Sequence, residues 1–144
     1  MAGASLLHIA LERNDTLSTI EALVEDGASV HAFDTRGEPL LVRAVRAGRA
    51  DIVDFLLRAG CNVHAQTHPA CLTALHVAAD LGDLDAIRLL LRARASCSMR
   101  SAAGLTPIAE ARRDANALRL MLAAAEEELL AAPAAELGAL ADAT

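Results

Sequence analysis

The stretch TALHVAADLGDLDAIRLLLRA, residues 73–93, predicts two short amphipathic helices joined by a tight turn at Gly82. Its apolar residues recur at the i, i+3 and i+4 spacing that places them on one side of a helix, at positions 75, 78 and 79 and again at 87, 90 and 91. Two helices of about nine residues cannot bury such stripes against each other and remain stable alone. The stretch therefore needs neighbours of the same kind.

The rest of the chain supplies these neighbours at a nearly constant interval. Segments similar to the first helix begin at residues 5, 39, 73 and 106, so that successive starts lie 34, 34 and 33 residues apart. The apolar residues of the second helix recur in step, and polar linkers rich in turn-forming residues, such as DGASVHAFDTRG (26–37), separate the copies. A period of about 33 residues with two helices and a turn predicts an all-α solenoid of four stacked units.

These copies resemble ankyrin repeats over roughly residues 3–125. The resemblance rests on motif residues that recur in register: Thr73, Leu75, His76, Ala78, Ala79 and Gly82 in one copy, Asp34, Gly37, Leu41, Ala44 and Gly48 in another, and Gly104, Thr106, Pro107 and Ala111 in a third. It implies repeats at about 3–32, 33–65, 66–99 and 100–125, separated by β-hairpin fingers that project from the helices. It also implies that the motif histidines His8 and His76 hydrogen-bond the backbone of adjoining loops.

A few positions depart from the motif, and the last residues lie beyond it. In the second copy Pro39 and Val42 stand where the capping threonine and the histidine are expected, and in the third Cys71 stands at a glycine position. After residue 125 we expect the last helix to continue through 126–132 until Pro133 stops it, followed by an acidic, alanine-rich tail to residue 144.

Composition and charge limit the possible functions. All thirteen basic residues are arginine and lie in residues 1–125 with fourteen acids, whereas residues 126–144 hold five acids and no base. A nearly neutral body with an acidic tail argues against nucleic-acid binding. The sequence has no apolar run of the roughly 20 residues that span a bilayer, so no membrane partner is expected. Three cysteines, an odd number, favour a reducing intracellular setting, cytoplasmic or nuclear.

One cluster of residue types could hold a metal. Cys61, His64, His68 and Cys71 supply two thiols and two imidazoles within eleven residues, which makes a zinc- or redox-responsive finger an alternative function. Against it, His31 occupies the same repeat position as His64 with no cysteines around it, which gives His64 a structural explanation. We find no phosphate-binding glycine loop, nucleophile elbow or H-E-x-x-H motif, and we expect neither an enzyme nor a bound cofactor.

The resemblance instead implies a concave face that binds another protein, formed by finger tips and exposed positions of the first helices. Carried over position by position, this face comprises Glu12, Arg13, Phe33, Thr35, Arg36, Glu38, Arg43, Arg46, His68, Leu81, Arg100 and Arg113.

Two features of this face suggest its partner. Phe33, one of only two phenylalanines, is an aromatic anchor candidate, unless its ring folds back on the next finger. Clustered arginines favour a partner that carries carboxylates, unless they are solvated or pair with Glu38 and Asp51. We therefore expect a non-catalytic adaptor, scaffold or inhibitor that is monomeric by itself. The acidic tail is a candidate intramolecular ligand of the same face.

Overall fold

The computed structural model describes residues 5–130, and the account below is confined to them. They form eight α-helices and one short 3-10 helix: α1 (Leu6–Glu12), α2 (Leu17–Glu25), α3 (Leu40–Arg46), α4 (Ala50–Arg58), α5 (Ala74–Leu81), α6 (Leu84–Arg92), α7 (Pro107–Glu110), η1 (Ala111–Arg113) and α8 (Ala115–Leu130).

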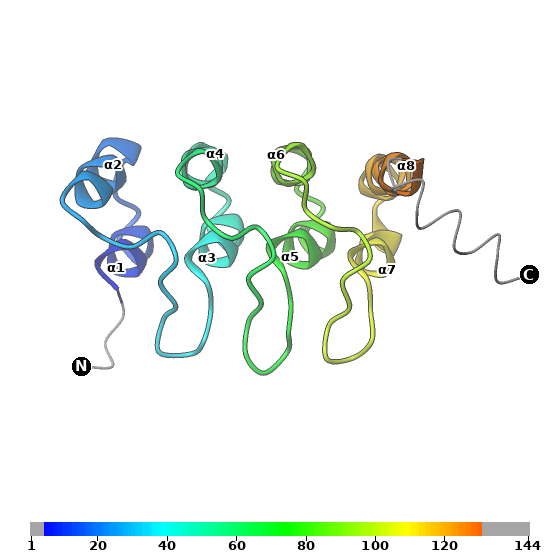
Figure 1. The fold of residues 1–144 in the computed structure, drawn as a ribbon, viewed down its shortest axis with the longest axis horizontal. Coiled ribbons are helices and arrows are strands. Elements are labelled where there is room, and N and C mark those ends of the chain that lie inside the picture. The colour runs from blue at the N-terminus through cyan, green and yellow to red at the C-terminus, as the bar shows by residue number, and fades with distance from the viewer. Residues whose placement is uncertain (1–4, 131–144) are drawn as a thin grey trace, which may run out of the picture.

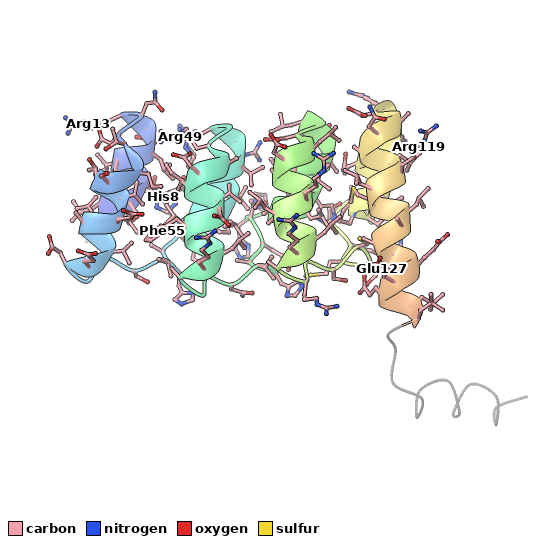
Figure 2. All side chains as sticks on the ribbon, turned by 90° about the horizontal axis from the view of Figure 1, so that it is seen from above. His8, Arg13, Arg49, Phe55, Arg119 and Glu127 are labelled. Atoms are coloured by element: carbon pink, nitrogen blue, oxygen red, sulfur yellow. The ribbon has the colours of Figure 1, made fainter. Side chains whose placement is uncertain are left out.

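The helices form two layers, and each layer is a row of helices along the length of the molecule. An inner layer contains α1, α3, α5 and α7, and an outer layer contains α2, α4, α6 and α8 (Figure 1). Seen from above, the outer helices lie side by side (Figure 2). Three linkers project beyond the inner layer as the first finger (26–39), the second finger (59–73) and the third finger (93–106). The predicted all-α solenoid of four helical pairs is confirmed.

The core lies between the two layers and is built from small and aliphatic side chains. In the stretch of residues 73–93, Leu75, Ala78, Ile87 and Leu90 are buried, whereas Leu91 is half-buried. Alanines at the interfaces between successive inner helices let these helices approach closely; Ala44, Ala78 and Ala111 are completely buried. The repeating alanines thus determine how tightly the units stack.

Side-chain caps fix where the helices begin. Thr73 accepts the backbone N–H of His76, and Thr106 accepts that of Ala109 with Pro107 in the first turn. No side-chain cap hydrogen bond is present at Pro39, where α3 begins.

The two motif histidines, His8 and His76, connect successive units through hydrogen bonds. The Nδ1 atom of His76 accepts the N–H of Thr73 at 3.1 Å, so the ring proton of the neutral imidazole lies on Nε2. This Nε2 donates to the carbonyl of Leu105 at 2.8 Å, at the end of the third finger. His8 makes the corresponding contact from Nε2 to the carbonyl of Glu38 at 3.1 Å. The expected role of both histidines is confirmed.

The fingers are hairpin-shaped, but within residues 5–130 they do not form regular β-strands. Only an isolated antiparallel bridge, between Phe33 and Pro39, is present in the first finger. The first two fingers also touch: the N–H of His68 donates to the carbonyl of Gly37 at 3.2 Å. A Cβ atom on Gly37 would lie 2.9 Å from the Cβ of His68, so this approach requires glycine, whose φ here is +78°.

The last helix is longer than its counterparts. α8 has 16 residues, whereas α2, α4 and α6 have nine each. It runs without interruption through the predicted boundary at residue 125 and is described to Leu130. The rest of the predicted extension, Pro133 and the acidic tail lie outside the described residues. Over residues 5–130, none of the helices combines the length and apolar character needed to cross a bilayer.

Candidate partner-binding surface

Four charged side chains from α1, the first finger and α3 form an arginine–carboxylate cluster. Glu38 is only 14% exposed and forms an ion pair with Arg46. Arg43 lies 4.0 Å from the same carboxylate and 3.8 Å from that of Glu12. The side chains of Arg43 and Arg46 nevertheless remain 32% and 44% exposed. The cluster therefore holds two guanidinium groups in fixed positions while leaving part of each accessible to a partner.

The tip of the first finger is rigid because Asp34 organises its backbone. Its Oδ1 accepts the N–H groups of Arg36 at 2.8 Å and Glu38 at 2.9 Å. Partial burial by itself raises the pKa of Asp34, but the hydrogen bonds from these two N–H groups outweigh that effect and leave the pKa below its ordinary value. The ionised carboxylate thus holds Thr35 and Arg36 in exposed positions at the tip.

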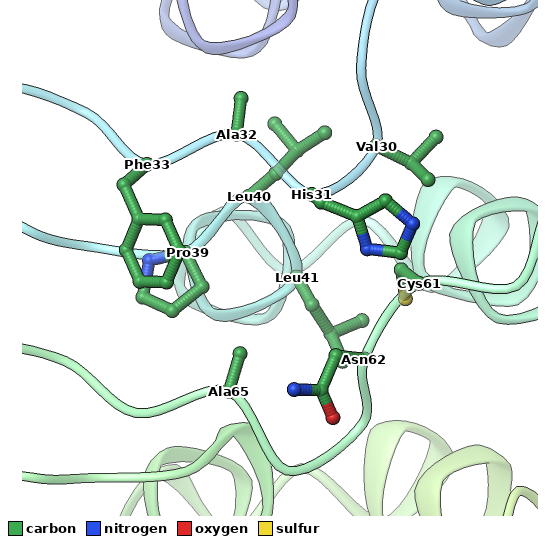
Figure 3. Close-up of a pocket in the computed structure, with 10 residues that line it drawn as sticks. All are labelled: Val30, His31, Ala32, Phe33, Pro39, Leu40, Leu41, Cys61, Asn62 and Ala65. Carbon is green, nitrogen blue, oxygen red and sulfur yellow. The ribbon is translucent and has the colours of Figure 1, made fainter.

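Phe33 lies beside a cavity between the first and second fingers. Its ring lies over Pro39 and stays 47% exposed (Figure 3). The finger cavity has a volume of about 110 Å³, and Leu41, Cys61 and His31 are among the residues that line it. The ring therefore folds back on its own finger and forms part of the cavity wall while keeping an accessible edge.

The cluster and the cavity lie on opposite sides of the first finger. Phe33 and Pro39 are bridge partners, which places their side chains on the same side of the hairpin. Glu38 adjoins Pro39, and successive residues of an extended chain point to opposite sides. Phe33 and the arginine–carboxylate cluster therefore lie on the two sides of the first finger, and a single partner-binding face that includes both stays a prediction.

The finger cavity is a local departure from the repeat. At the equivalent position between the second and third fingers, the Nε2 atom of His64 accepts the N–H of Ser96 at 3.2 Å. The residue equivalent to Phe33 there is Gln66, whose amide donates to the carbonyl of Cys71 at 3.1 Å. Sequence reasoning did not identify His31 as a cavity residue. The sequence signal that could have revealed the cavity is the difference between Phe33 and Gln66, which stand at equivalent positions of the first and second fingers.

The other predicted site residues are spread along the array. Leu81, at the end of α5, is an exposed large apolar side chain. Arg100 donates to the carbonyl of Gly104 at 2.9 Å and so lies along its own finger. The remaining residues of the predicted set are also exposed, at the ends of inner helices or on the second finger: Arg13, His68 and Arg113.

The four side chains of the zinc alternative are not brought together. His64 is directed toward Ser96 of the following unit, and the thiol of Cys71 lies 3.6 Å from the carbonyl of Pro69. Burial raises the pKa of Cys61 to about 11, which opposes the thiolate form that binds zinc. In the described part of the chain, no three His, Cys, Asp or Glu side chains are close enough to hold one ion. Cys61 lies at the base of the second finger, where its N–H donates to the carbonyl of Leu56, whereas Cys71 belongs to the turn at the finger tip, where its N–H donates to the carbonyl of Thr67.

Arg49, which was not predicted from the sequence, links the first two units. Its guanidinium donates to Asp51, to the side chain of Asn14 at 2.9 Å and to the carbonyl of Asp15 at 3.0 Å. The hydrogen bond between Arg49 and Asp51 raises the pKa of the arginine and lowers that of the carboxylate. The Arg49 side chain therefore has a structural role, because it joins the turn between α3 and α4 to the turn between α1 and α2.

Comparison with known proteins identifies the repeat. Two family models match, "Ankyrin repeats (3 copies)" over residues 2–67 and "Ankyrin repeat" over residues 71–102. The B-cell lymphoma 3 protein homolog of Mus musculus is 32% identical over 111 residues, which cover 76% of this chain and 24% of that protein. Inversin of Homo sapiens is 33% identical over 105 residues, covering 73% of this chain and 10% of inversin.

A solved structure agrees with these matches. The crystal structure of the ankyrin repeat domain of Bcl-3 superposes with a TM-score of 0.76 at 32% identity, covering 83% of this chain and 51% of that one. The chain thus spans at most about a quarter of the length of these two curated relatives. Ankyrin repeats are modules of protein–protein interaction. Motif, fold and relatives agree, and the chain belongs to the ankyrin-repeat family.

Proposed function

We propose that this chain is a non-catalytic module that binds a partner protein through its inner helices and its first finger, as an adaptor, scaffold or inhibitor. The observation that carries the proposal is the pair of half-exposed arginines, Arg43 and Arg46, held in place by the nearly buried Glu38. Guanidinium groups that are already ordered lose little side-chain entropy on binding. They favour a partner surface that presents carboxylates, which guanidinium groups bind in bidentate geometry.

The finger cavity supplies a second kind of contact. A space of about 110 Å³ beside the exposed edge of Phe33 suits one apolar side chain of the partner. The partner would then straddle the first finger, with carboxylates on the side of Arg46 and an apolar anchor on the side of Phe33. In this proposal the isolated module is monomeric, because both sides of the first finger contact the partner protein and not a second copy of this chain.

Partner capture followed by quantitative binding tests this arrangement. Proteins retained from the source organism by the wild-type chain are compared with those retained by F33A, R46A and the double variant. We expect the double variant to lose about 2 kcal/mol of binding energy, or about 30-fold in affinity, with unchanged helical content. Arg58→Ala is the control, because Arg58 lies on outer helix α4 with its side chain 79% exposed.

The two single variants test the two sides of the finger separately. Loss of binding in R46A alone would place the partner on the inner helices, and loss in F33A alone would place it at the finger cavity. A partner that binds the folded double variant as tightly as the wild type would contradict the proposed surface.

The contacts of α8 decide how binding of the acidic tail to the same face can be tested. Truncation at Ala125 would remove the last turns of α8, where Glu128 accepts hydrogen bonds from Ser96 and Cys97. Charge-neutralising substitutions in the full chain, E136Q with D142N, avoid this damage. If the tail competes with the partner, we expect these changes to raise partner affinity at low salt and to have less effect at high salt.

A further inference from the structure

A groove of about 1120 Å³ lies between outer helices α6 and α8, close to the base of the third finger. It is formed by different elements from those that form the arginine–carboxylate cluster and the finger cavity. Its apolar lining includes Leu91 from α6, Ala95 from the finger base, Ile108 from α7, and Leu120 and Ala124 from α8. We call it the outer groove.

The outer groove exists because α8 is long and is held at its far end. Seven residues more than in α6 carry α8 past the end of its neighbour, and Glu127 and Leu129 of this extension line the groove (Figure 2 labels Glu127). Glu128 accepts the hydroxyl of Ser96 at 3.1 Å and the N–H of Cys97 at 3.3 Å. The extension is therefore fixed to the finger base, and the groove is formed before any ligand arrives.

The groove floor carries no charge of its own at neutral pH. Cys97 is buried at the floor, and its thiol lies 3.8 Å from the carbonyl of Met121. Burial raises the pKa of Cys97 to about 11, and the nearby charge of Glu128 acts in the same direction. The thiol thus stays protonated and behaves as a small apolar group.

One wall of the outer groove is strongly basic. Arg88, Arg92 and Arg94 line it, and we call these three residues the arginine wall. Arg88 and Arg92 are four residues apart on α6, a spacing at which like charges repel. Among the described residues, the only ion pair that these three arginines form joins Arg88 to Asp85 at 3.5 Å. The wall is thus a concentration of exposed positive charge beside an apolar floor.

We propose that the outer groove is a second docking surface, which takes an amphipathic helix of a partner protein with carboxylates along the edge that faces the arginine wall. Apolar side chains of the helix would cover the floor between Leu91 and Leu120, as amphipathic helices do in hydrophobic grooves. Carboxylates one helical turn apart match the spacing of Arg88 and Arg92. Glu127, on the opposite wall, disfavours an acidic residue there and so fixes the orientation of the helix.

A displayed library of helix-forming peptides, selected against the full chain, tests this inference. We expect the enriched peptides to have an apolar stripe with glutamate or aspartate repeated four residues apart on one edge. The double variant R88Q/R92Q should bind them at least about 10-fold more weakly, because two charge-assisted contacts are lost. R58Q, on α4, should bind as the wild type does.

A second variant blocks the groove without touching the arginines. Ala123 is exposed and lines the groove, so A123E keeps a good helix former while adding bulk and negative charge. It should reduce peptide binding by a similar factor, with helical content unchanged in circular dichroism. Binders that lack the acidic edge, or that bind both groove variants as tightly as the wild type, would overturn the proposal.

The chain's own acidic residues are tested in the same experiment. If peptides bind only after E136Q and D142N are introduced, the groove serves the chain's own residues 131–144 and the partner-helix proposal fails. If the wild-type chain and the E136Q/D142N variant select the same peptides, the result supports a helix from a partner protein. Because the outer groove shares no residue with the arginine–carboxylate cluster or the finger cavity, F33A and R46A should leave peptide binding unchanged, which separates this outcome from that of the proposed function.

Discussion

At the scale of single residues, Cys71 holds a backbone conformation that favours glycine. Its φ is +54°, and the equivalent positions in the other two fingers are Gly37 and Gly104, with φ of +78° and +79°. A left-handed conformation costs a residue with a side chain about 1–2 kcal/mol. We predict that C71G raises the free energy of unfolding by about 0.5–1 kcal/mol, since relief of strain exceeds the entropy that glycine adds to the unfolded chain.

Urea denaturation of C71G beside C71S isolates this cause. Serine removes the thiol but keeps the Cβ atom, so C71S should show no gain. A similar gain in both variants would mean that the thiol itself is destabilising, and the backbone argument would fail.

Single residues also show what the sequence could not predict. The glycine position of Cys71 and the bonds of His8 and His76 were predictable, because each belongs to a motif position that recurs in register. The separation of Phe33 from Arg46 was not, because motif positions do not say toward which side of a finger a residue points. Nor could the sequence predict the hydrogen bonds of Glu128 to the base of the third finger, because they depend on how far α8 continues.

At the scale of elements, α3 differs from the other inner helices at its first turn. Pro39 offers neither a hydroxyl nor an N–H, and Val42 is buried where His8 and His76 stand in the neighbouring units. The carbonyl of Leu72, which corresponds to those of Glu38 and Leu105, accepts the N–H of Thr67 at 2.9 Å. A histidine at position 42 would add a second donor to this carbonyl.

A double-mutant cycle on α3 tests whether cap and histidine act together. V42H alone should destabilise the protein, because Pro39 provides no N–H for the Nδ1 atom of a buried ring. In P39T/V42H the threonine supplies both the cap and that N–H. We predict a favourable coupling of about 1–2 kcal/mol between the two changes in urea denaturation. Additive effects would show that the two positions are independent in this unit.

At the scale of the whole molecule, the units are joined by a series of ties between neighbours. His8 and Arg49 join the first unit to the second, and contacts between fingers, such as His68 to Gly37, join the second to the third. His76 joins the third unit to the last. In such a linear array each unit is stabilised mainly by its nearest neighbours. Loss of one such hydrogen bond should therefore increase local unfolding of the terminal unit that it joins to the rest of the array.

Hydrogen exchange followed by mass spectrometry tests this with His8→Ala and His76→Ala. Each change removes a buried ring that bonds to a neighbouring finger, at an expected cost of about 1–3 kcal/mol. We predict that H8A accelerates exchange in α1 and α2, whereas H76A accelerates it in α7 and α8. Helices α3 and α4 should be less affected than the end that opens in each variant, because they remain packed against the third unit in both. Equal acceleration in every helix would instead show that the four units open as one cooperative structure.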